Sequence, residues 1–311
     1  TLGSPLAFLI RNKDYANWRE QMDPRLPPEK GREIREARPG HADLSGALKY
    51  GFQDLRNVME RSSARETAVR AAGGSICAQF LAFFEISARS HVLSIGGVES
   101  PKEKYNFDDL SAARDSPVCC LHPQAELLMM EEIEKAREAG DSLGGVFEII
   151  VRGVPAGLGT YVHWDRKLDM RLAGALMSIQ GIKGVEIGAG FQGSRRRGSA
   201  FHDPIFYSGE KGFYRSSNRA GGIEGGMSNG EDLVLRAAMK PLPTLSKPLP
   251  TVNLITKEPA LAAVERRDVC AVPAAAVVAE LVVLTVVAAA FLETYGADSL
   301  ERIKQRWQTW K

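Results

Sequence analysis

The chain has 311 residues, of which 44% are hydrophobic and 25% are charged, as in an ordinary globular protein. Its 40 basic and 38 acidic residues leave a net charge of +2, which is too balanced for an electrostatic nucleic-acid binder. The four cysteines have no metal-ligand spacing, so they indicate reduced thiols in a cytoplasmic protein, and no metal site is predicted.

The first part of the chain is predicted to contain one strand and a long loop. The apolar run from Leu6 to Ile10 is typical of a strand, whereas 12–36 is charged, carries three prolines and is expected to be mostly loop. No basic and apolar leader opens the chain, so no secretory signal is predicted. The first residues are typical of a turn in the middle of a fold, followed directly by a strand. We therefore expect that an earlier segment is missing.

Arginines surround a predicted helix start in the first quarter of the chain. Ser63 and Glu66 fit a capping box, which predicts a helix over about 63–84. The free amides at a helix start attract anions, and Arg61 and Arg65 would add two bidentate donors there. The pattern predicts a phosphate or polycarboxylate ligand. A capped helix with a solvated basic face and no ligand is the alternative.

Two further features flank this helix start. His41 follows Pro39 and Gly40 in a predicted turn, where a histidine can titrate near neutral pH and reach a ligand. The run of small residues over 71–74 includes two glycines, which weaken a helix interior. We expect close backbone packing at this run to compensate for that loss.

The rest of the chain is predicted to mix strands and helices. Strands are expected at His91–Gly97, Val146–Val154, Gly184–Ile187 and Asp232–Met239, and helices at Glu126–Glu138, around Leu168, Leu172, Leu176 and Ile179, and after Asp298 and Ser299. Between them, 99–116 is predicted to be a surface excursion, 188–230 to be loops, and 241–250 to be a stiff extended connection. Periodicity alone indicates a mixed α and β fold.

The segment from Ala271 to Leu292 is almost wholly apolar and close to the length that a bilayer requires. Pro273 and the mid-span Glu280 argue against a membrane span, and the small alanine and valine side chains suit tight packing inside a protein. We interpret it as a buried core or subunit-interface helix, so no membrane partner is predicted.

A series of motifs in chain order resembles the chorismate synthase family. The motifs are RPGHAD (38–43), KYG (49–51), RSSARETAVR (61–70), GVPAGLG (153–159), QGIKGVEIG (180–188), NRAGGIEGGMSNG (218–230), MKPLPTL (239–245) and RRDVCAVPAA (266–275). The resemblance implies an α+β fold, a β-α-β sandwich with a central helical layer, as a single domain over 1–311 in a homotetramer. The family's first Gly-Glu-Ser-His-Gly motif, with one of two catalytic histidines, is absent from the sequence.

The resemblance also implies a reaction. Chorismate synthase removes phosphate from C3 and a proton from C6 of 5-enolpyruvylshikimate 3-phosphate, an anti-1,4 elimination that needs reduced FMN although no net oxidation results. The substrate carries a phosphate and two carboxylates, and arginine forks suit such a ligand. Family members either accept reduced FMN from outside or carry an NADPH-dependent reductase activity. No added reductase domain is visible, which favours the first kind.

Residue roles follow by resemblance. His41 matches the histidine that protonates reduced FMN, and Asp268 matches the aspartate that helps flavin N5 take the C6 proton. The matches for cofactor binding are Arg61, Ser62, Ser63, Gln180, Gly181, Asn218, Gly225, Lys240, Pro241, Leu242, Pro243, Thr244 and Arg266. The matches for substrate binding are Ser63, Ala64, Arg65, Thr244 and Arg266. Without the resemblance, Asp268 reads as an ion-pair carboxylate with a lowered pKa, and Gly225 as a plain turn glycine.

Two other functions stay open from the sequence. One is a flavin- or phosphate-binding protein without turnover, which the absent histidine motif would permit. The other is nucleic-acid binding through the three consecutive arginines Arg195–Arg197. It has little support because no row of aromatic residues accompanies the arginines.

Overall fold

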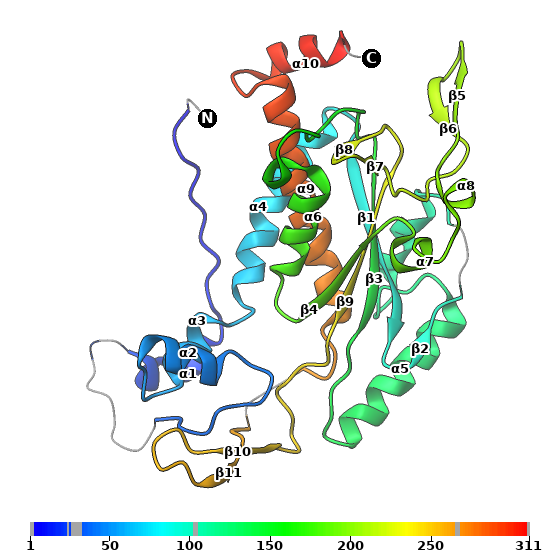
Figure 1. Ribbon diagram of the computed structural model, residues 1–311. Helices are drawn as coiled ribbons and strands as arrows, with labels where there is room; N and C mark the ends of the chain where they lie inside the picture. Colours follow the sequence, from blue (N-terminus) through cyan, green and yellow to red (C-terminus); the bar gives the residue numbers. More distant parts are fainter. Residues whose placement is uncertain (1–2, 24, 26–32, 102–104, 265–267, 310–311) are drawn as a thin grey trace. The chain divides into compact units, whose positions relative to one another are not determined.

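The computed structural model describes residues 3–23, 25, 33–101, 105–264 and 268–309. These residues form two compact units (Figure 1). Unit 1 comprises Thr1–Val69 and Pro243–Arg267, and unit 2 comprises Arg70–Leu242 and Asp268–Lys311. The single domain predicted from the sequence stays a prediction.

Unit 1 is built from short helices and one hairpin. Its elements are α1 (Tyr15–Met22), α2 (Asp43–Tyr50), α3 (Arg56–Arg61), the first turn of α4 (Glu66–Ala82), β10 (Pro250–Val252) and β11 (Pro259–Leu261). Its small core consists of Ala37, Ala47, Leu55, Met59 and Leu254. Across it, Thr251 Oγ1 donates to the Ala37 carbonyl at 2.7 Å, so the β10–β11 hairpin is tied to the segment before α2.

The strand predicted for the first residues is wrong, and the stretch predicted to be mostly loop contains one short helix. Residues 6–10 have no regular structure and are exposed, because no described strand pairs with this apolar run. The predicted loop over 12–36 contains α1. Asp14 accepts from Asn17 Nδ2 at 3.0 Å and Trp18 Nε1 at 3.1 Å, and these side-chain bonds hold the first turn of that helix.

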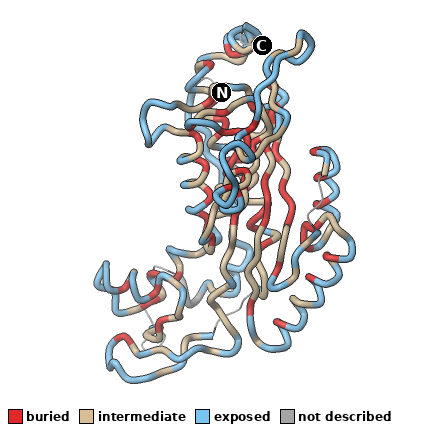
Figure 2. The backbone as a smooth tube through the Cα atoms, turned by 45° about the vertical axis from the view of Figure 1, so that its right-hand side comes forward, coloured by how far each residue is buried: buried red, intermediate tan, exposed pale blue. Residues whose placement is uncertain are grey.

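Unit 2 contains a five-stranded antiparallel sheet with the order β2-β1-β3-β9-β4. The strands are β1 (Ser87–Ile95), β2 (Val98–Glu99), β3 (Gly145–Arg152), β4 (Ile182–Ile187) and β9 (Leu233–Met239). They confirm the strands predicted from apolar runs. Figure 2 shows the buried residues running along these strands and the helices beside them. Helices with antiparallel sheets make this an α+β fold, as predicted; the described residues contain one large sheet.

Three helices of the described chain pack on this sheet, and two more pack on the longest of those three. They are α4, α5 (Pro123–Glu138), α6 (Leu168–Met177), α9 (Val272–Tyr295) and α10 (Leu300–Gln308). The four predicted apolar positions of the α6 segment, from Leu168 to Ile179, are all buried. Ser299 caps α10 by accepting from the Arg302 amide at 3.3 Å. The later helices predicted from periodicity and capping are therefore confirmed.

Helix α9 crosses the core of unit 2, as predicted, and twelve of its residues are buried. It is long and apolar enough to cross a membrane by length and composition, and most of it is buried inside the protein. Its Glu280 accepts from Ser90 Oγ at 3.0 Å and from Arg114 at 2.5 Å. At Gly74 of α4, an added Cβ would lie 2.4 Å from the Leu281 carbonyl oxygen, which confirms the predicted close packing.

Two segments predicted as irregular carry short elements. The excursion over 99–116 includes the 3-10 helix η1 (Asp109–Asp115), and its Leu110 and Ala113 are buried because they pack on the sheet side. The loops over 188–230 contain α7 (Gly190–Gly193), α8 (Gly198–Phe201), β5 (Ile205–Ser208), β6 (Gly212–Arg215), β7 (Ile223–Glu224) and β8 (Met227–Ser228). A turn η2 (Trp164–Arg166) precedes α6. Elements this short lack a full hydrophobic period, so the sequence pattern did not predict them.

Candidate active site

His41 occupies a turn of unit 1, as the sequence predicts. Gly40 adopts a left-handed φ of 80°, which turns the chain just before His41 and α2. The imidazole Nε2 lies 3.0 Å from Thr244 Oγ1, a contact between residues 203 positions apart. Two residues predicted to serve the same reaction therefore meet, and Thr244 restrains the orientation of the imidazole.

A buried ion pair holds this turn, and sequence reasoning missed it. Asp43 is fully buried, and its carboxylate accepts from Arg38 Nε at 2.8 Å, from the far guanidinium nitrogen at 3.1 Å and from the Arg38 amide at 3.1 Å. The pair closes a loop around His41. The sequence does contain a signal for this ion pair, because Arg38 and Asp43 are the first and last residues of the RPGHAD motif.

The turn over 61–65, predicted to bind an anion, does not form the predicted capping box. Ser63 Oγ accepts from the Arg65 amide at 3.3 Å and from Arg65 Nε at 2.9 Å, two residues on, and not from the Glu66 amide that the box requires. Helix α4 begins only at Glu66, after 3-10 turns. Arg61 is the last residue of α3, so the two arginines do not share one helical face.

Arg65 is already engaged in an ion pair. Its guanidinium contacts Glu60, and about half of its side chain is exposed. Ser62 lies at the C-cap of α3, where its amide donates to the Val58 carbonyl at 2.9 Å. Ala64 sits in the turn between the two helices. The hydroxyls and guanidinium groups of this turn remain suited to an anion that would take over from Glu60.

In unit 2, two predicted flavin segments lie side by side. The Lys240 amide donates to the Gly181 carbonyl at 2.9 Å, which joins the residue after β9 to the residue before β4. Gly181 has a φ of 86°, a left-handed conformation that favours glycine, and an added Cβ would lie 2.9 Å from Met239 Cε. Gln180, half-buried, ends the turn after α6.

The chain around Lys240 is tightly packed. Burial lowers the pKa of the Lys240 ammonium, and the charge of Lys183 lowers it further. Lys183, which the sequence did not single out, sits at an irregularity in the β4–β9 pairing. An added Cβ at Gly144 would meet the Met239 carbonyl at 2.3 Å and Pro241 N at 2.8 Å.

The residues after Lys240 and Pro241 are also fixed by contacts. Ser142 Oγ donates to the Leu242 carbonyl at 2.5 Å. Pro243 belongs to unit 1, where it lines a small hollow together with Arg38 and Pro39. The predicted Lys-Pro segment thus supplies residues to both units.

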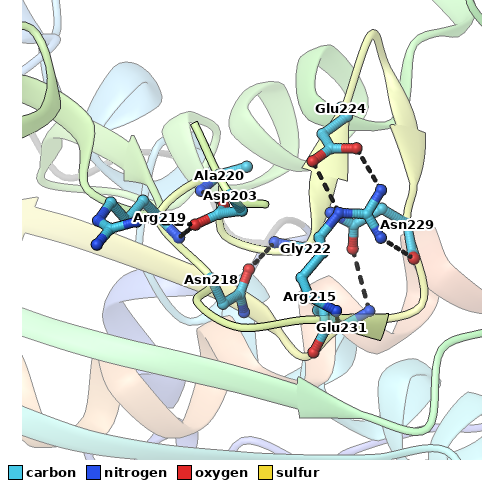
Figure 3. A network of polar contacts seen from close by, with 9 residues as sticks. All are labelled: Asp203, Arg215, Asn218, Arg219, Ala220, Gly222, Glu224, Asn229 and Glu231. Atoms are coloured by element: carbon cyan, nitrogen blue, oxygen red, sulfur yellow. Dashed lines mark hydrogen bonds and ion pairs between the residues drawn. The ribbon is translucent and has the colours of Figure 1, made fainter. Parts of the chain in front are cut away.

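Asn218 organises the glycine-rich loop (Figure 3). Its Nδ2 donates to the Asp232 carbonyl at 2.7 Å, and its Oδ1 accepts from the Gly222 amide at 2.7 Å. Asp203 beside it accepts from the amides of Arg219 and Ala220, both at 2.9 Å. Asn218 therefore stabilises the conformation of the glycine-rich loop, with or without a bound ligand.

Gly225 lies at the tip of the β7–β8 hairpin with a φ of 61°. An added Cβ would meet no atom within 4 Å, so the backbone is open to an approaching group at this point. Asp268 is exposed. Its neighbours Arg266 and Arg267 lie outside the described residues, and so do the roles predicted for Arg266 and the ion pair expected for Asp268.

The fold is α+β, and these residues lie in motifs of one enzyme family. The family model of chorismate synthase matches residues 1–292. A chorismate synthase of Alkaliphilus metalliredigens is 57% identical over 310 residues, covering 100% of this chain and 82% of that protein. One of Moorella thermoacetica is 56% identical over 306 residues, covering 98% of this chain and 80% of that protein.

A solved structure agrees with these relatives. A crystal structure of a chorismate synthase superposes with a TM-score of 0.76 at 44% identity, covering 86% of this chain and 75% of that one. The chain belongs to the chorismate synthase family. It is a lyase of aromatic amino-acid biosynthesis that acts on a small-molecule substrate.

Proposed function

We propose that this chain performs the family's elimination with reduced FMN and with the residues described above. His41 protonates reduced FMN, the 61–65 turn contacts flavin and substrate, and Gln180, Gly181 and Lys240 contact the flavin, as the family resemblance implies. The assignment rests chiefly on one observation, the 3.0 Å contact between His41 Nε2 and Thr244 Oγ1. Two residues that the family resemblance assigns to the reaction meet although 203 positions separate them.

The donors in these segments fit FMN chemically. A flavin phosphate needs cationic and hydroxyl donors, which Arg61, Ser63 and Lys240 supply. A flat ring needs backbone without side chains, and the open position at Gly225 meets that need. When bound, reduced FMN supplies the electron-rich ring that the elimination requires.

The chain's own residues bind the substrate, orient the reacting groups and carry protons. Arg65 exchanges Glu60 for an anionic group of the substrate, because its fork pairs with a carboxylate or a phosphate equally well. An imidazole can donate a proton near neutral pH, and Thr244 keeps the His41 ring in one orientation. The C3–O bond breaks with its electron pair leaving on phosphate while the C6 proton departs, so no net oxidation occurs.

Three finer assignments belong to the same proposal. The enzyme uses reduced FMN as its cofactor, as the family resemblance implies. It works as a homotetramer, as the family resemblance implies. It acts in the cytoplasm, which the four free cysteines support.

Substitution of Thr244 tests the proposal. Thr244→Val removes the hydroxyl that positions His41, so we expect the rate of phosphate release with reduced FMN under anaerobic conditions to fall at least tenfold. Thr244→Ser should restore most of the rate. Thr251→Val is the matched control, because it removes a threonine hydrogen bond to Ala37 in the same unit without touching His41. Equal rates for Thr244→Val and wild type would contradict the assignment.

A further inference from the structure

The hairpin that carries Gly225 is too short to hold its own shape. Strands β7 and β8 have two residues each and pair in antiparallel register. Gly225 and Gly226 form the turn with φ values of 61° and 91°, the left-handed backbone that tight hairpin turns require. A hairpin of two strands is marginally stable at best in water. Contacts from outside the hairpin therefore have to fix the position of its tip.

The β8 side of the hairpin is fixed by the GVPAGLG motif at 153–159 and by the start of α6. The buried Ser228 accepts at its Oγ from the Leu158 amide at 2.9 Å, and its own amide donates to the Leu158 carbonyl at 2.9 Å. The Gly226 carbonyl accepts from the Leu168 amide at 2.8 Å. These contacts hold β8 and the second residue of the turn, and they leave the residue before Gly225 to another anchor.

Arg215 of β6 supplies that anchor with one guanidinium group (Figure 3). Its Nε and Nη2 donate to the two carboxylate oxygens of Glu224 at 3.0 and 2.6 Å, and its Nη1 donates to the Asn229 carbonyl at 2.9 Å. Glu224 directly precedes Gly225, and Asn229 directly follows β8. A single side chain therefore contacts the hairpin on both sides of its tip.

The guanidinium group is itself well placed to fix a position. The Arg215 side chain is 12% exposed, and the Arg215 amide donates to Glu231 Oε1 at 2.9 Å. A guanidinium is a rigid planar fork, and its bidentate contact with a carboxylate sets direction as well as distance. Because the same fork also bonds the Asn229 carbonyl, it fixes the spacing between the two sides of the hairpin.

We propose that Arg215 is a positioning residue for flavin binding, which acts through Glu224 and the Asn229 carbonyl to hold the Gly225 backbone in place. This role rests on the proposed function, which gives the open backbone at Gly225 to the flavin. Arg215 acts at a distance from the cofactor, because its donors are already bonded to the hairpin. It lies outside the glycine-rich motif at 218–230, so the motif alone does not contain all that the loop needs.

A double-mutant cycle tests whether Arg215 acts through Glu224. FMN is titrated onto the whole chain for Arg215→Met, Glu224→Ala and the double variant. Each single substitution should weaken FMN binding about five- to tenfold, because a charge-assisted contact is lost. The double variant should bind FMN no more weakly than Arg215→Met, because both changes remove the same contact. The KM for reduced FMN should rise in all three, with little change in kcat.

The ion pair of Arg171 with Glu293 provides the matched control. It joins α6 to α9 of unit 2 at 2.8 Å and has a comparable exposure. Arg171→Met and Glu293→Ala should leave FMN affinity unchanged even where they lower the denaturation midpoint. In the flavin-free chain, hydrogen exchange at the Gly225 and Gly226 amides should be faster in Arg215→Met than in Arg171→Met.

Two outcomes would overturn the proposal. Unchanged FMN affinity in Arg215→Met or in Glu224→Ala would show that the pair serves stability alone. Additive losses in the double variant would show that Arg215 acts on the flavin by another route than Glu224. A wild-type chain that binds no FMN would refute the proposed function itself, whereas the positioning role fails by itself only when wild type binds FMN and the variants bind it equally well or additively worse.

Discussion

The two units hold their predicted site residues by different means. Unit 1 has a core of five buried apolar residues, and its functional turn depends on polar contacts such as Arg38 with Asp43 and Thr251 with Ala37. Unit 2 has one large apolar cluster that spans its sheet and helices, and its loops are seated by close backbone contacts such as that of Gly144 with the Met239 carbonyl. Loss of a polar contact should therefore harm unit 1 most, and overpacking should harm unit 2 most.

The largest expected effect is in unit 1. Asp43→Ala leaves the Arg38 guanidinium buried without its partner, and breaking a buried pair costs about 3 to 5 kcal/mol. Hydrogen exchange should show faster opening of α2 and the His41 turn, with unit 2 amides unchanged. Asp54→Asn is the control, because it keeps the Oδ1 acceptor for the Ile34 and Arg56 amides. Equal opening in the two variants would remove the special role given to the pair.

Two buried carboxylates of unit 2 should respond to pH in opposite directions. Burial would raise the pKa of Glu148, but the hydrogen bond from His91 and the charge of Arg236 outweigh it and lower the pKa. Ionised Glu148 therefore stabilises the fold above about pH 4.5, and this contribution is lost as the pH falls through its folded pKa. Glu148→Gln should cost about 3 kcal/mol at pH 7 and less as the pH falls.

Glu280 provides the contrast. Burial raises the pKa of its carboxyl, and Arg114 and Ser90 offset this only in part. The ionised form therefore costs stability once the pH rises above its folded pKa. Urea denaturation across pH 4 to 8 should show Glu280→Gln gaining on wild type as the pH rises, while Glu148→Gln loses. Parallel pH profiles for the two variants would contradict this account.

Alanine substitutions at two helical glycines should have smaller effects on stability, and of opposite sign. Gly74→Ala places a Cβ against the Leu281 backbone, so we expect a loss of about 1 to 3 kcal/mol from overpacking. At Gly174 in α6 an added Cβ meets nothing within 4 Å, and Gly174→Ala should stabilise the helix by about 1 kcal/mol. The denaturation midpoint of each variant measures this. Similar midpoints would show that α4 and α9 can separate at no cost.

Local signals predicted much of unit 2 and little of unit 1. The strands β1, β3 and β9 and the helix α5 follow from apolar periodicity and capping, which depend on neighbours in sequence. The ion pair of Arg65 with Glu60 depends on the turn between α3 and α4, and the contact of Lys240 with Gly181 depends on tertiary packing, so no helix or strand pattern indicates either of them. Physical reasoning from the residues alone did predict that His41 lies in a turn. Its partner Thr244 was assigned only through the family motifs.

The central claim is that His41 supplies a proton during the elimination while other residues hold the ligands. Single-turnover phosphate release with reduced FMN, measured beside flavin binding for wild type and His41→Ala, tests it most directly. We expect flavin affinity to change less than threefold and release to slow by about 10² to 10⁴, the usual contribution of a general acid or base. If His41→Ala releases phosphate at most of the wild-type rate, or loses rate only because flavin no longer binds, the claim is wrong.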